Sequence, residues 1–77
     1  MNSLEIREIM SKVFEIDLSE ISNNANQKDI MKWDSLQHLN LIVEIEDKFD
    51  ISLDPEDISA MVTVEKIIEV VNKYKNV

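Results

Sequence analysis

Asp34 and Ser35 stand at the start of a long stretch with helical periodicity, and this pair is the part of the sequence best suited to chemistry. Asp34 is a good N-cap residue, because its side chain can accept hydrogen bonds from the first free N–H groups of a helix. Ser35 would then lie in the first turn, where its hydroxyl stays exposed and the helix dipole favours an incoming anion. The pair therefore predicts a serine to which a phosphate diester can be attached.

His38 is the only histidine, and it lies one turn after Ser35. A Ser–His pair of the kind used in nucleophilic catalysis is therefore a candidate. On a helical wheel, however, His38 falls on the core-facing side, and no oxyanion loop or third partner is apparent. A packing or surface role is favoured, and no catalytic residue is predicted. The acidic residues lack the spacing and the central glycine of an EF-hand, so no metal site is predicted either.

The helix that begins at Ser35 carries two apolar stripes. The stripe expected to face the core contains His38, Leu41, Ile42, Ile45 and Phe49. The second stripe contains Leu36, Leu39 and Val43. One core-facing stripe is normal for a surface helix, so the second exceeds what a single core needs. Two interpretations stay open: a wider buried face, or an apolar surface, edged by acidic residues, that meets a partner.

Helical spacing recurs along the rest of the chain and predicts helices near residues 3–14, 35–49 and 63–74, with a short helix near 55–60. Asp54 is a candidate cap for the short helix, since Pro55 suits the first helical position. Thr63 is the candidate cap of the last helix. The polar, aperiodic residues from 17 to about 33 predict a long loop between the first and second helices. The fold class is therefore an all-α four-helix bundle in a single domain, residues 1–77.

The composition restricts the partners and the compartment. The net charge is −8, and eight acidic residues face one lysine between residues 34 and 57. Such a surface repels nucleic acid and anionic membranes and attracts basic patches on proteins. There is no cysteine, so any thiol used by the protein must come from a cofactor, and there is no glycine, so turns must use Asn, Asp and Ser. No signal peptide or membrane-length apolar run is found, which predicts a cytoplasmic protein.

The chain as a whole resembles a stand-alone acyl carrier protein of the phosphopantetheine-binding family. The marker of that family is Asp-Ser-Leu at the start of the second helix, present here as Asp34-Ser35-Leu36. Further positions that fit the family pattern are Ile21 to Ala25, Glu46-Asp47, Phe49, Leu53, Met61 and Thr63-Val64. Together with the length and acidity, these positions make the resemblance specific over nearly the whole chain.

The resemblance implies a monomeric carrier, not an enzyme. A phosphopantetheinyl transferase would use coenzyme A and magnesium to attach 4′-phosphopantetheine to Ser35, and Asp34, Leu36 and Met61 would lie along the arm. The terminal thiol of the arm would hold acyl groups as thioesters for partner enzymes, as in lipid or polyketide biosynthesis. Basic patches of these enzymes would dock on an apolar and acidic surface. The predicted docking residues are Leu36, Leu39, Val43, Glu44, Glu46, Asp47 and Glu56.

Residues 30–33, Ile-Met-Lys-Trp, depart from carriers of fatty-acid synthesis, which usually have Asp-Leu-Gly before this point. The departure favours a specialised biosynthetic pathway, and Trp33 is expected to be a partly buried packing residue. Two alternatives remain. One is an aminoacyl or peptidyl carrier, although such carriers often have histidine before the serine. The other is an unmodified acidic four-helix adaptor in which Ser35 is only a helix cap, and Asn40 supports it slightly because typical carriers have an acid there.

Overall fold

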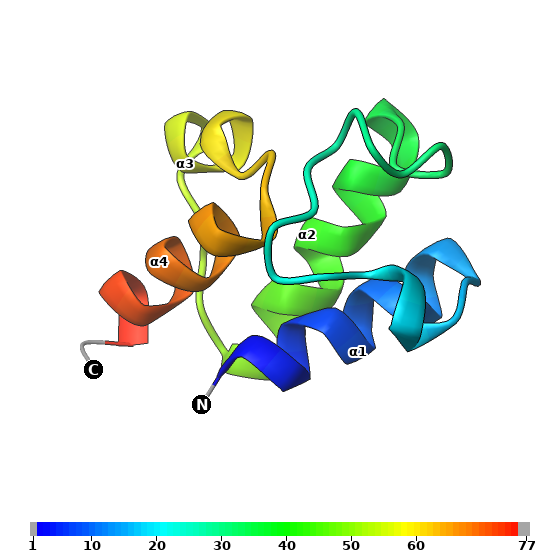
Figure 1. Ribbon diagram of the computed structural model, residues 1–77. Coiled ribbons are helices and arrows are strands. Elements are labelled where there is room, and N and C mark those ends of the chain that lie inside the picture. The colour runs from blue at the N-terminus through cyan, green and yellow to red at the C-terminus, as the bar shows by residue number, and fades with distance from the viewer. Residues whose placement is uncertain (1, 76–77) are drawn as a thin grey trace.

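The computed structural model describes residues 2–75, with side chains from residue 3 onward, and this part of the chain is helical (Figure 1). Its elements are α1 (Asn2–Phe14), a short 3-10 turn η1 (Leu18–Glu20), α2 (Ser35–Phe49), α3 (Pro55–Ala60) and α4 (Val64–Lys75). The four predicted helices are confirmed, and their ends differ by no more than one residue from the predicted bounds. Within residues 2–75 the only extended pairing is an isolated bridge between Asn26 and Thr63.

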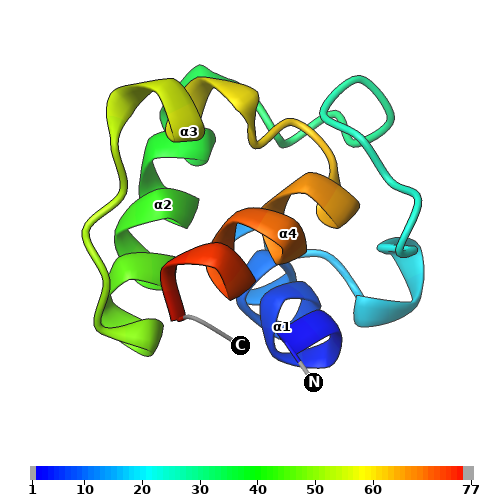
Figure 2. The ribbon, with the colours of Figure 1, turned by 90° about the vertical axis from the view of Figure 1, so that its left-hand side faces the viewer.

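One hydrophobic core holds the bundle together. α1 contacts both α2 and α4, and α4 lies beside α1 in both ribbon views (Figure 2). The core is built from the apolar stripes of these three helices and from anchors in the connecting segments. Its fully enclosed side chains include Ile6, Met10, Phe14, Ile21, Leu41, Ile45, Met61, Val64, Ile67 and Val71. Burial of these stripes, rather than local helix propensity, supplies most of the stability of such short helices.

The long connection between η1 and α2 crosses one side of the molecule and is fastened to the segment between α3 and α4 (Figure 1). The Gln27 N–H donates to the Val62 carbonyl at 2.8 Å, and the Val64 N–H donates to the Ala25 carbonyl at 3.0 Å. Ala25 and Ile30 are buried, so the loop is also tied to the core. The loop and the α3–α4 segment therefore form one wall next to the start of α2.

Helix α3 has six residues and no fully buried side chain. Its N-cap prediction is wrong in its mechanism, because Asp54 occupies the cap position but its side chain makes no capping bond. The Asp54 N–H instead donates to the Tyr74 hydroxyl oxygen at 3.0 Å. Thr63 does cap α4 as predicted, since its Oγ1 accepts from the Lys66 N–H at 3.0 Å.

Two turns show how the chain manages without glycine. Asp50 ends α2 in the left-handed conformation, with φ 55°, and its N–H donates to the Glu46 carbonyl. Glu15 follows α1 with φ 57°. Asp50 is of a residue type that tolerates this conformation, as expected. Glu15 is not, because glutamate is not among the residue types predicted for the turns. No helix among residues 2–75 has both the length and the apolar character needed to span a bilayer.

Candidate functional site around Ser35

The start of α2 is built as the sequence predicts. The Asp34 Oδ1 accepts from the Gln37 N–H at 2.8 Å, so Asp34 is the N-cap. Ser35 is the first helical residue, and its side chain is exposed. Because Asp34 provides the capping bond, Ser35 is not needed as a cap, and it lies in the first turn, where the free N–H groups of a helix favour an anion.

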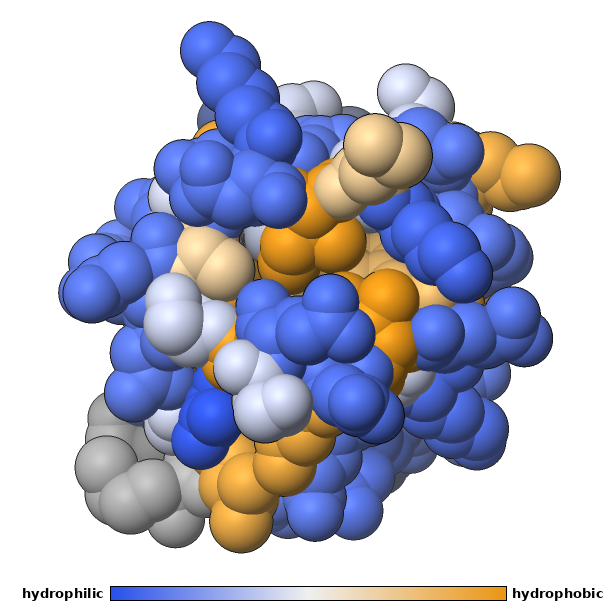
Figure 3. All heavy atoms as spheres, turned by 45° about the vertical axis from the view of Figure 1, so that its right-hand side comes forward, coloured by the Kyte–Doolittle hydropathy of each residue, from blue (hydrophilic) through white to orange (hydrophobic). Residues whose placement is uncertain are grey.

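The second apolar stripe of α2 lies on the surface. Leu41, Ile42, Ile45 and Phe49 are buried, whereas Leu36, Leu39 and Val43 are 67%, 57% and 59% exposed. Figure 3 shows one face of the molecule, on which apolar side chains emerge between hydrophilic ones. Of the two interpretations of this stripe, the wider buried face is therefore wrong. An exposed apolar row on one helix marks a surface suited to contact with another molecule.

The acidic residues near this row differ in their surroundings. Asp47 and Glu56 are exposed. Glu44 is half-buried, and its Oε1 lies 3.9 Å from the Lys12 Nζ. Glu46 has a structural contact that the sequence did not predict, since its Oε2 accepts from the Leu53 N–H at 2.8 Å. Glu46 therefore fastens the linker between α2 and α3.

Trp33 is 2% exposed, so the expectation of a partly buried side chain is wrong, although its role in packing is confirmed. Its ring lies against Phe14, with centroids 5.6 Å apart, and it stacks on His38 at 6.1 Å. Trp33, the residue directly before Asp34, is thus a large aromatic anchor packed at the start of α2.

His38 uses both of its ring nitrogens. The indole Nε1–H of Trp33 donates to the His38 Nδ1 at 2.9 Å, and the His38 Nε2 lies 2.9 Å from the Ile58 carbonyl oxygen in α3. An indole nitrogen can only donate, so Nδ1 must accept and Nε2 must carry the proton that it donates to Ile58. His38 is therefore not available as a general base for Ser35, and the structural role favoured from the sequence is confirmed.

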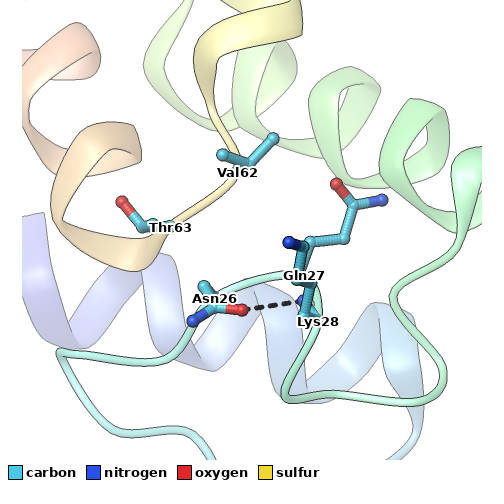
Figure 4. Close-up of a pocket in the computed structure, with 5 residues that line it drawn as sticks. All are labelled: Asn26, Gln27, Lys28, Val62 and Thr63. Carbon is cyan, nitrogen blue, oxygen red and sulfur yellow. Dashed lines mark hydrogen bonds between the residues drawn. The ribbon is translucent and has the colours of Figure 1, made fainter.

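A shallow cavity of about 320 Å³ lies beside Ser35. Its lining comes from the loop, α2, α3 and the segment after α3. The lining residues are Gln27, Ser35, His38, Leu39, Ile58, Ser59 and Val62. Gln27 and Val62 also line a neighbouring hollow of about 430 Å³, together with Asn26, Lys28 and Thr63 (Figure 4). The two hollows therefore lie on either side of Gln27 and Val62.

Met61 does not line this cavity. Its side chain is 0% exposed and belongs to the core, whereas its neighbour Val62 is 40% exposed and lines both hollows. Gln27 and Ser59 are further lining residues that the sequence did not predict. They reach Ser35 only because the loop is bonded to the α3–α4 segment, and no local pattern reveals that contact.

A set of polar contacts among Asp57, Lys73 and Tyr74 joins α3 to α4. The Tyr74 hydroxyl donates to the Asp57 Oδ2 at 2.6 Å, and the Lys73 Nζ lies 3.2 Å from Oδ1. These bonds hold the pKa of Asp57 below its ordinary value, with the Tyr74 bond as the larger cause and Lys73 as the second. The same bond to Asp57 raises the pKa of Tyr74. Among the described residues, no group of three or more His, Cys, Asp and Glu could hold a metal ion.

Comparison with known proteins agrees with this geometry. The family model described as "Phosphopantetheine attachment site" matches residues 5–71. An acyl carrier protein of Buchnera aphidicola is 40% identical over 74 residues, which cover 94% of each chain. An acyl carrier protein of Desulforapulum autotrophicum is 34% identical over 65 residues, covering 84% of each chain.

The solution structure of a holo acyl carrier protein from Geobacter metallireducens has the same fold. It superposes with a TM-score of 0.85 at 28% sequence identity, covering 99% of this chain and 88% of that protein. With the family model and the curated relatives, this match extends from sequence to three-dimensional structure. The chain belongs to the acyl carrier protein family, whose prosthetic group is 4′-phosphopantetheine.

Proposed function

We propose that this protein is an acyl carrier whose attachment residue is Ser35. The observation that supports the proposal best is the exposed first-turn serine beside a separate N-cap, Asp34. The Ser35 Oγ would attack the phosphorus that bears the pantetheine of coenzyme A. The new Oγ–P bond would form as the pyrophosphate bond breaks, with adenosine 3′,5′-bisphosphate leaving and the serine proton passing to a base of the transferase.

The residues around Ser35 suit such a group. When attached, the group supplies a terminal thiol on which acyl groups are held as thioesters. The free N–H groups at the start of α2 stabilise the negative phosphate, because the helix dipole is positive there. Leu36 and Val62 offer apolar surface on either side of Ser35, and Gln27 and Ser59 offer polar groups in the cavity. Met61 supports this wall from within the core rather than contacting the arm directly.

The docking surface in this proposal is the row of Leu36, Leu39 and Val43 with the acidic residues around it. The apolar row supplies side chains that can be desolvated at the centre of an interface, where most binding energy is concentrated. Asp47 and Glu56 are the exposed acids that would meet a basic enzyme patch, while Glu44 and Glu46 also have partners within the protein. The partners would be the transferase and the enzymes that load, modify and unload the cargo.

The pathway and the compartment are also part of the proposal. The buried Trp33 and its contact with His38 distinguish the start of α2 from the Asp-Leu-Gly pattern of fatty-acid carriers. This difference supports a specialised pathway, with acyl groups as cargo, and the cytoplasm is the compartment that we propose. An aminoacyl cargo is the alternative within the same mechanism.

Modification by a transferase tests the proposal. The protein is incubated with coenzyme A, magnesium and a broad-specificity phosphopantetheinyl transferase, and its intact mass is measured. The wild type should gain one phosphopantetheine, and Ser35→Ala should gain none. Ser59→Ala is the matched control, because Ser59 lines the same cavity and is also exposed, and it should be modified like the wild type. A wild type that is never modified would favour the unmodified adaptor instead.

A further inference from the structure

The segments on either side of helix α3 are anchored in the core by Leu53 and Met61, and α3 itself, between these anchors, is held by polar contacts at its two sides. It has no fully buried side chain, and only Ile58 packs partly against the core. On the side of α4, Asp57 is bonded to Tyr74 and Lys73. On the side of α2, the Ile58 carbonyl oxygen is bonded to His38. Between its two anchored ends, the orientation of α3 relative to Ser35 therefore depends on a small number of identifiable bonds.

The His38 ring connects three segments of the chain at the cavity. Its own backbone is in α2, one turn after Ser35, and its N–H donates to the Asp34 carbonyl at 2.8 Å. Its Nδ1 is bonded to Trp33, which is buried under the start of α2, and its Nε2 is bonded to α3. The Trp33 bond selects the Nε2–H form of the ring, and this form is the one that can donate to Ile58.

We propose that His38 is a positioning residue, which fixes α3 against the first turn of α2 and thereby sets the shape of the cavity beside Ser35. Ile58, Ser59 and Val62, which belong to α3 and the segment after it, line that cavity together with Ser35. Trp33 acts through His38, because it keeps the imidazole in the form that binds α3. The consequence for a group attached to Ser35 rests on the proposed function, whereas the positioning of α3 does not.

The ring form can be measured directly in the unmodified wild type. Nitrogen NMR of the neutral His38 ring should show the proton on Nε2, and the Trp33 indole N–H should exchange slowly with solvent. In Trp33→Phe the acceptor at Nδ1 loses its partner, so the Nδ1–H form should become populated. A wild-type ring protonated at Nδ1, or one with both forms mixed, would overturn the proposal without any substitution of His38.

Substitutions of His38 separate its two bonds. In His38→Gln the side-chain amide N–H can replace Nε2 toward Ile58, while in His38→Asn the amide oxygen can replace Nδ1 toward Trp33. His38→Leu keeps the apolar bulk and loses both bonds. The matched control is Asn40→Ala, an exposed change on the same helix that removes a bond to Gln37.

Hydrogen exchange of the α3 backbone amides, followed by NMR, gives the readout. The N–H groups of Ile58 and Met61 should exchange about tenfold faster in His38→Leu and His38→Asn, as expected for the loss of one hydrogen bond. They should stay near the wild-type rate in His38→Gln and Asn40→Ala. The Trp33 indole N–H should exchange slowly with solvent in His38→Asn and faster in His38→Leu. Folded variants that all exchange like the wild type in α3 would overturn the proposal.

The same variants keep this inference separate from the proposed function. Transferase treatment of His38→Leu should still modify Ser35, because the serine and its cap Asp34 are unchanged. Loss of α3 protection with modification intact supports both proposals. Unchanged α3 protection with modification intact contradicts only the role of His38, and absence of modification in the wild type contradicts only the carrier function.

Discussion

Ser35 and His38 lie one turn apart on α2, but they contribute different properties. Ser35 offers an exposed hydroxyl and has no structural duty as a cap, because Asp34 fills that position. His38 is half-buried and has both ring nitrogens engaged, so it supports the site without taking part in proton transfer. In the proposals made above, Ser35 therefore serves attachment and His38 serves positioning.

Asp34 gives a prediction that separates stability from attachment. Asp34→Ala removes the acceptor for the Gln37 N–H and should lower the free energy of unfolding by about 1 kcal/mol, as for other N-cap aspartates. Ser35→Ala should change it by only a few tenths of a kcal/mol. Urea unfolding followed by Trp33 fluorescence measures both values. A larger loss in Ser35→Ala than in Asp34→Ala would show that the serine, not the aspartate, is the effective cap.

Helix α2 presents two faces, and each has its own consequence. The buried face fixes the helix on α1 and the core, while Leu36, Leu39 and Val43 are exposed and form the docking row of our proposal. The acids around this row are not equivalent, because Glu46 is bonded to the Leu53 N–H. Reversing the charge of Glu46 would also disturb the α2–α3 linker, so Asp47 and Glu56 are better residues with which to test electrostatic docking.

The docking surface is tested by the kinetics of transferase binding. Asp47→Lys with Glu56→Lys should slow association and weaken its dependence on salt, because exposed charges act mainly on encounter and are screened over about 8 Å at physiological ionic strength. Leu39→Ala should instead speed dissociation, with little change in the salt dependence. Glu65→Lys, on the exposed surface of α4, is a charge-reversal control. If the double charge reversal leaves association and its salt dependence unchanged, the acidic surface does not guide docking.

The contact between α3 and α4 predicts how stability depends on pH. The pKa of Asp57 is lowered in the folded protein, first by the Tyr74 hydroxyl and then by Lys73. A group with a lowered folded pKa stabilises the protein above its unfolded pKa, here near 3.8, and this stabilisation is lost as the pH falls through the folded value. The opposite holds for Tyr74, whose pKa is raised, so its contribution should be lost at alkaline pH above about 10.0.

Thermal unfolding at a series of pH values measures this effect. The wild type should lose stability below about pH 3.8 more steeply than Asp57→Asn, which has no carboxylate to protonate at this position. Tyr74→Phe should show an intermediate slope because Lys73 still faces Asp57. Equal acid slopes in the wild type and Asp57→Asn would contradict this account of the α3–α4 contact.

The whole molecule combines predictable helices with contacts that no local pattern reveals. Periodicity predicts the four helices, and Asp34, Pro55 and Thr63 mark the starts of α2, α3 and α4, since these signals depend only on neighbouring residues. The bond from Glu46 to Leu53, the pairing of Gln27 with Val62 and the His38 bridge to α3 join segments brought together by folding. Trp33 was recognised as a packing residue, but its full burial depends on Phe14 from α1. The sequence therefore predicts Ser35 and its neighbouring cap Asp34, but it does not predict the cavity beside them.

The position of the prosthetic group is the claim on which the rest depends, and the sequence allows it to be measured in one step. Trypsin cleaves after Lys32 and Lys48, and Ser35 is the only hydroxyl-bearing residue in the resulting peptide 33–48. Ser59 lies in a different tryptic peptide. After treatment with coenzyme A and transferase, tandem mass spectrometry should find one phosphopantetheine in peptide 33–48 and none in the peptide that contains Ser59. A phosphopantetheine on any other peptide, or none on peptide 33–48 of fully treated protein, would contradict the assignment of Ser35.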